Sequence, residues 1–86
     1  MNLDQGDQKL NSPITSRVLS EVDSAKPGWE DQFLNIIGET WGEEAKSRAR
    51  TLIIEDAQRK TNLRRYIHRK DSDSLNTLLS ILQAPP

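Results

Sequence analysis

The sequence contains no cysteine and a single histidine, His68, and these shortages exclude several kinds of chemistry. Disulfides, zinc–cysteine sites and cysteine nucleophiles cannot form, and neither can metal motifs that require two histidines. The four glycines are scattered, so the sequence has no glycine-rich phosphate loop. No serine or acidic residue is positioned by its spacing to act with His68, which we expect to lie on the surface. We therefore expect a protein that is not an enzyme and that uses no metal or cofactor.

Long apolar runs are also missing. The longest aliphatic run covers only residues 52–54, whereas a helix needs ~20 apolar residues to span a bilayer. Residues 1–5 are polar and acidic, unlike the basic start and apolar stretch of a secretory signal. The lack of cysteine fits a reducing compartment. We expect no membrane association and a cytoplasmic location.

Apolar residues are scarce as well, since hydrophobic residues make up 34% and aromatic residues 5% of the 86 positions. Globular domains usually contain about 45–50% apolar residues. A chain of this length buries only roughly 60% of the surface that its unfolded form exposes. The formal net charge of -1 nevertheless argues against a self-repelling, disordered chain. We expect one folded domain with a small hydrophobic core, which gains stability from a partner or from self-association.

The apolar residues that are present recur at helical spacing, and no segment of useful length alternates with period two. The sequence predicts a flexible polar tail over residues 1–11, a helical domain over 12–83 and a short C-terminal tail over 84–86. The first helix should begin at Ser12-Pro13 and end at 26–28, where lysine, proline and glycine follow one another. The fold class expected is all-α, a compact bundle of four or five short helices.

The third predicted helix is long, and both of its ends need interpretation. Residues 40–43 match the capping box, which predicts a helix start at about Trp41. If this helix ran on through the basic residues after it, Asp56 and Lys60 would lie in the middle of its apolar face, where burial is costly. A break with Thr61 capping a further short helix avoids that cost, but the pair could equally lie beyond the edge of the core. The sequence leaves this choice open.

Four leucines from Leu75 to Leu82 predict a C-terminal helix, and Ile81 widens its apolar stripe. We expect this helix to close the core of its own domain rather than to lie in the groove of a partner. Asp71 to Ser74 supply several possible caps for its start.

Charge is strongly segregated along the chain. Residues 1–45 hold 9 acids and 3 bases, whereas residues 46–70 hold 9 bases and 2 acids. Within 58–70 there are six bases and no acid. Arginine and lysine can neutralise phosphates or carboxylates, and an aromatic ring among them can stack on a base. The candidate partner-binding or nucleic-acid-binding residues in this segment are Arg59, Lys60, Arg64, Arg65, Tyr66, Arg69 and Lys70.

The two tryptophans are the largest apolar side chains. Trp29 shares a helical stripe with Phe33 and Ile37, which places it in the core. Trp41 follows a predicted helix cap beside Gly42, and it is either a core residue or a further partner contact, because tryptophan is enriched at interface hot spots.

The function we expect is that of a small, non-enzymatic protein-interaction module, such as an adaptor, a regulator or an assembly subunit. Its partner would be another protein with an acidic surface, or a second copy of the chain, and complementary charge would set specificity. Nucleic-acid binding through the basic segment is the alternative. The sequence pI of about 5.8 counts against it, because domains that bind nucleic acids more often have a pI above ~9. A basic segment that contacts only solvent also remains open.

Overall fold

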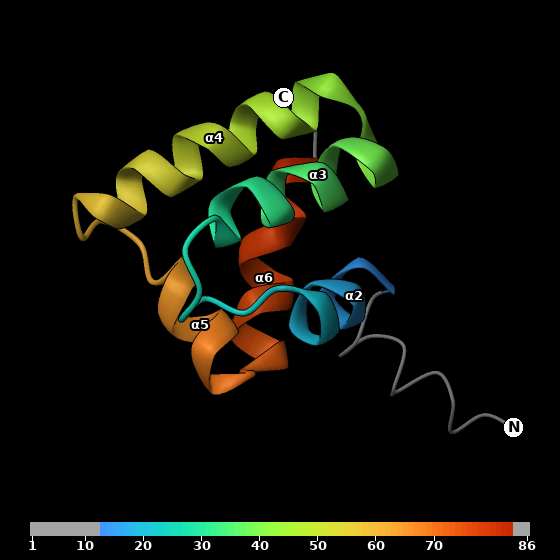
Figure 1. Ribbon diagram of the computed structural model, residues 1–86. Helices are drawn as coiled ribbons and strands as arrows, with labels where there is room; N and C mark the ends of the chain where they lie inside the picture. The colour runs from blue at the N-terminus through green and yellow to red at the C-terminus, as the bar shows by residue number, and fades with distance from the viewer. Residues whose placement is uncertain (1–12, 84–86) are drawn as a thin grey trace, which may run out of the picture.

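The computed structural model describes residues 13–83, and this range folds into five helices with no strand (Figure 1). The all-α bundle of short helices predicted from the sequence is therefore confirmed. The predicted tails at 1–11 and 84–86, and the cap at Ser12, lie outside the described residues. In chain order the helices are α2 (Pro13–Glu21), α3 (Trp29–Trp41), α4 (Glu43–Ala57), α5 (Leu63–Arg69) and α6 (Ser72–Gln83).

Helices α3 and α4 form an antiparallel hairpin, and their contact is the most extensive of the helix pairs. Helix α6 packs against α2, α4 and α5, so it joins the hairpin to the two shortest helices. Figure 1 shows α5 beside the end of α4, at the opposite end of the hairpin from the α3–α4 turn. No helix in the part of the chain described here is long and apolar enough to cross a membrane.

All five helices contribute to one hydrophobic core. Trp29 is only 8% exposed, as its stripe predicted, and Phe33 is fully buried. The C-terminal helix closes the core with Leu75, Leu79 and Leu82. The side chains buried most completely are Phe33, Ile36, Ile37, Leu63, Ile67, Leu75, Leu79, Leu82, Val18 and Thr15.

Ile81 does not widen the buried stripe of α6, as the sequence predicted, because it is 60% exposed. The helix turns Leu75, Leu79 and Leu82 toward the core, and a residue one position before Leu82 is rotated by about 100° away from that face. The stripe is therefore narrower than the sequence indicates.

The start predicted for the third helix is wrong. Thr40 and Trp41 belong to the last turn of α3, no side chain caps α4, and the break falls at Gly42. Gly42 has φ 94° and ψ -177°, a combination that only glycine adopts readily. Its N–H donates to the carbonyl of Gly38 and its carbonyl accepts from Lys46, so one residue ends one helix and begins the next. The backbone freedom of Gly42, and not a capping box, sets this boundary.

The first helix ends at Glu21, earlier than the predicted stop at 26–28. The side chain of Asp23 accepts a hydrogen bond from the N–H of Ala25 at 3.0 Å, and its carbonyl accepts from Lys26. Aspartate competes in this way with helical hydrogen bonds. The chain therefore leaves the helix several residues before Pro27, and the segment over 22–28 crosses to α3.

Helix α2 is fixed to its neighbours by polar contacts. Arg17 forms ion pairs with Glu39 at 2.7 Å and with Glu21 at 3.1 Å. The hydrogen bonds accepted by Glu39 and Glu21 raise the pKa of Arg17 above its ordinary value. On the buried side, the hydroxyl of Thr15 donates to Asn76 of α6 at 2.9 Å.

Candidate functional site

The structure resolves the choice between one long helix and two, because α4 ends at Ala57 and α5 begins at Leu63. The turn between them starts at Arg59, whose φ of 66° is left-handed. The N–H of Arg59 donates to the carbonyl of Asp56 at 2.9 Å, and the N–H of Lys60 donates to that of Glu55 at 2.8 Å. These two bonds form a Schellman motif, which usually has glycine at the left-handed position. Asp56 and Lys60 consequently do not form a pair along one helix.

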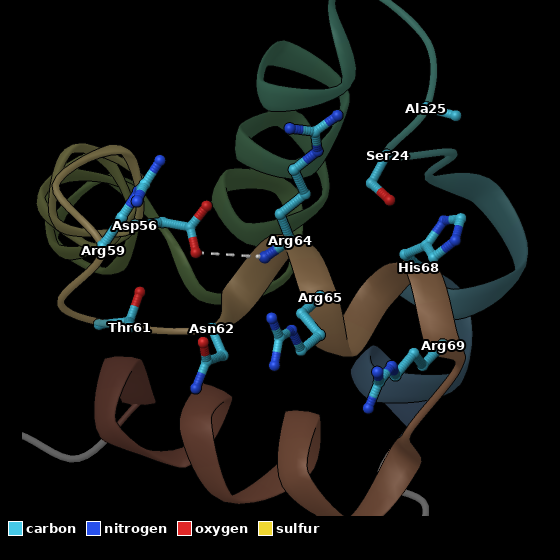
Figure 2. A pocket seen from close by; sticks show the side chains of 10 residues that line it. All are labelled: Ser24, Ala25, Asp56, Arg59, Thr61, Asn62, Arg64, Arg65, His68 and Arg69. Atoms are coloured by element: carbon cyan, nitrogen blue, oxygen red, sulfur yellow. Dashed lines mark hydrogen bonds between the residues drawn. The ribbon is translucent and has the colours of Figure 1, made fainter.

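Of the two alternatives left open by the sequence, the break is present, but Thr61 does not cap α5. The N-cap position is Asn62, and its side chain makes no capping hydrogen bond. The carboxylate of Asp56 instead accepts a hydrogen bond from the backbone N–H of Arg64 at 3.4 Å (Figure 2). The Schellman turn brings the end of α4 back toward the start of α5, so an acid eight residues away takes the place of a local cap.

A groove of about 640 Å³ lies across the outer face of α5. Its walls come from the end of α4, from the turn after it and from the segment between α2 and α3. In Figure 2, Arg64 and His68 lie one above the other on one side of α5, and Arg65 and Arg69 do so on the adjacent side. This arrangement follows from their spacing of four residues in a helix. The lining residues are Ser24, Ala25, Asp56, Arg59, Thr61, Asn62, Arg64, Arg65, His68 and Arg69.

The groove is strongly basic. It contains four arginines and one acid, Asp56. Within residues 13–83 the ion pairs belong to Arg17 and Arg48, and none involves an arginine of the groove. Arg65 and Arg69 are like charges at i,i+4, an arrangement that costs about 0.2–0.5 kcal/mol in an isolated helix. The guanidinium groups of the groove are therefore not used in ion pairs within residues 13–83.

A buried hydroxyl without a hydrogen-bond partner lies at one wall of this groove. Ser24 is 3% exposed, and its Oγ finds no partner among the described residues. In Figure 2 the hydroxyl points toward α5 on the side of His68, with Arg64 across from it. The hydroxyl of Thr61, at the other end, is also buried and has no hydrogen-bond partner among residues 13–83. A buried polar group in this state costs about 1–3 kcal/mol.

The structure brings together only some of the residues predicted to bind a partner. Arg59, Arg64, Arg65 and Arg69 all line the groove. The other four predicted residues, Lys60, Tyr66, Lys70 and Trp41, do not line it.

Each of these four residues has a different position. Lys60 is exposed in the turn before α5, and Tyr66 packs against the core. Lys70 ends α5 and donates from Nζ to the carbonyl of Leu19 at 2.9 Å, which fastens it to α2. Trp41 is partly buried against the core and is the last residue of α3, beside the turn into α4.

Sequence reasoning missed Ser24 and Asp56 as parts of the site and placed His68 only on the surface. His68 is indeed exposed, and it also lines the groove. Its spacing of four from Arg64 was a signal that could have assigned it to the same face. Nothing in the sequence could have indicated Ser24, because the fold brings the segment between α2 and α3 to the edge of the groove.

The described range holds no candidate metal site. Among residues 13–83, no three acidic or histidine side chains gather closely enough to hold a metal ion. No protein-family model matches the chain, and no curated protein or solved structure is similar enough to it to indicate a relative. With no relative to compare, function is inferred from the groove itself.

Proposed function

We propose that this protein is a non-enzymatic helical interaction module that binds an acidic segment of another protein in the groove across α5. The observation that supports this most is the gathering of four arginines, without ion pairs in residues 13–83, along a groove of about 640 Å³. A guanidinium presents a planar fork of donors that matches a carboxylate or a phosphate. The proposed location is the cytoplasm, as the cysteine-free sequence favours.

The surroundings of the groove favour a compact acidic partner over a long nucleic acid. Glu30 and Asp31 lie in the first turn of α3, directly after the segment that forms one wall of the groove, and the chain has a net charge of -1. A polyanion extending beyond that wall would approach these acids. Tyr66, the aromatic residue of the basic segment, packs against the core and so is poorly placed to stack on a base.

The test uses a matched pair of charge reversals. Arg64→Glu changes a groove arginine, and Arg50→Glu makes the same charge change on an exposed residue of α4 that does not line the groove. Tagged wild-type protein and both variants are incubated with native lysate, half of it treated with nuclease, and the retained protein and nucleic acid are measured.

We expect a stoichiometric protein partner that survives nuclease, that Arg64→Glu loses and that Arg50→Glu keeps. Raising the salt concentration should weaken the binding, because the contact is between exposed charges. Recovery of nucleic acid, with the protein partners lost after nuclease treatment, would refute the proposal in favour of nucleic-acid binding. If the retained partner is a second copy of this chain, sedimentation of the wild type and of Arg64→Glu should show the self-association and its loss.

A further inference from the structure

We propose that the groove holds the phosphate group of a phosphorylated serine or threonine in the acidic partner, with Ser24, Arg64 and His68 forming the phosphate subsite. This inference rests on the proposed function, since it specifies which chemical group of the partner enters the groove. It is carried by the juxtaposition of a buried, unpartnered hydroxyl from the α2–α3 segment with two basic side chains from α5.

Ser24 is the part of this subsite that an ordinary basic surface would lack. Its side chain is buried by the fold, yet its hydroxyl makes no hydrogen bond within residues 13–83, and in Figure 2 it points toward α5 on the side of His68, with Arg64 across from it. Buried hydroxyls normally find a partner. An acceptor oxygen held between Arg64 and His68 would receive a hydrogen bond from Ser24. A phosphate group suits that position because its several oxygens can accept from all three side chains at once.

The charge of the groove also suits a dianion. Four arginines face one carboxylate, and that carboxylate, Asp56, is already used to accept the backbone N–H of Arg64. A single carboxylate of the partner would leave most of this positive charge uncompensated, whereas a phosphorylated side chain brings a charge of about -1.5 to -2. Arg65 and Arg69, on the adjacent side of α5, are placed to receive acidic residues that flank the phosphate.

Arg59 lines the groove from the left-handed position of the Schellman motif, where glycine would be the unstrained choice. Lys70, at the end of α5, is left-handed as well and does not line the groove, so this conformation by itself does not mark the site. An arginine at this position adds a fourth guanidinium to the groove, on the wall formed by the end of α4.

Three fluorescently labelled peptides test the inference by anisotropy with the full chain. They share the same acidic flanks and differ at the centre, which is serine, phosphoserine or a pair of glutamates that matches the charge of the phosphate. We expect the phosphoserine peptide to bind about tenfold or more tightly than the charge-matched peptide, as a group held by several charge-assisted hydrogen bonds should. The serine peptide should bind most weakly.

Ser24→Ala is the decisive variant, and Ser47→Ala, on an exposed face of α4, is its matched control. Because the hydroxyl of Ser24 has no partner in residues 13–83, its removal should leave the fold intact. Ser24→Ala should lower the affinity for the phosphoserine peptide about fivefold or more and leave the charge-matched peptide within about twofold. Ser47→Ala should change neither affinity. If Ser24→Ala fails to fold, His68→Ala, at an exposed position, gives the same comparison.

The outcomes separate this inference from the function on which it rests. Equal affinity for the phosphoserine and charge-matched peptides would overturn the phosphate subsite while leaving acidic-protein binding in place. A phosphoserine preference that Ser24→Ala and His68→Ala both leave unchanged would place the phosphate elsewhere and would also overturn it. Inorganic phosphate that bound as tightly as the phosphoserine peptide would assign the site to a free anion. Failure of every peptide to bind, with no partner captured from lysate, would refute the proposed function itself.

Discussion

Replacing Arg59 isolates the cost of a left-handed residue at the edge of the groove. Arg59→Gly and Arg59→Ala remove the same charge, but only the alanine variant keeps a Cβ at φ 66°. An L-residue in this conformation destabilises the folded state by roughly 1–2 kcal/mol. Glycine avoids that strain, but it makes the unfolded chain more flexible, which lowers the free energy of unfolding by about 0.4–1 kcal/mol. The midpoints of these two ranges differ by about 0.8 kcal/mol, so Arg59→Gly should be more stable than Arg59→Ala by about 0.5–1 kcal/mol.

Urea unfolding followed by the fluorescence of the two tryptophans, Trp29 and Trp41, measures this difference. A gap of 0.5–1 kcal/mol corresponds to roughly 2–8 °C in the melting temperature of a domain of this size. Both variants should bind the acidic partner more weakly than the wild type to a similar extent, because both lose one guanidinium from the groove. An alanine variant as stable as the glycine variant would show that residue 59 is not left-handed, and the Schellman geometry of the α4–α5 turn would be wrong.

Three further predictions follow from other parts of the fold, each measured by denaturant unfolding. Gly42→Ala should destabilise the protein by about 1–3 kcal/mol, because only glycine tolerates that backbone conformation. Gly38→Ala should be neutral or stabilising by up to about 1 kcal/mol, because Gly38 lies inside α3 and a Cβ there would displace only the flexible side chain of Lys46. Asp71→Ala should cost about 0.5–2 kcal/mol, because its carboxylate accepts from the N–H of Ser74 at the start of α6. Trp29→Ala should cost about 3–5 kcal/mol, and Trp41→Ala should cost clearly less, since Trp41 is only partly buried; equal costs would place both rings in the core.

The sequence predicts the helices well where apolar periodicity alone decides. The stripe that includes Trp29, Phe33 and Ile37 is buried, and the leucines of α6 close the core. Periodicity shows which face of a helix is apolar. Because this domain has few apolar residues, almost every apolar face is needed to form its core. The fold class follows from that pattern.

The sequence predicts the helix ends less well, because they depend on backbone conformations and on competing hydrogen bonds. Gly42 separates α3 and α4 by adopting a conformation that no motif of side chains announces. Asp23 ends α2 early by accepting a hydrogen bond from the backbone N–H of Ala25, and Asp56 takes the place of a local cap at the start of α5 from eight residues away. Each outcome depends on where the chain goes next, so a local pattern could not determine it.

The candidate site could also be predicted only in part, because some of its residues are far apart in the sequence. The arginines of the groove could be predicted from charge alone, because Arg64, Arg65 and Arg69 are close in sequence and one helix holds them. Ser24 could not be predicted, because it lies some forty residues away along the chain.

The features of this groove that weaken the fold are also the ones that a ligand would use. Ser24 has a buried hydroxyl without a partner in residues 13–83, Arg59 occupies a position that suits glycine, and Arg65 and Arg69 repel each other. A sequence selected for stability alone would have little reason to collect three such features around one groove, and departures from local rules are expected where a binding site needs them. An anion bound here would satisfy the hydroxyl and neutralise the arginines. Ligand binding should therefore stabilise the folded protein, and in the part of the chain described here we expect the gain to be largest around α5.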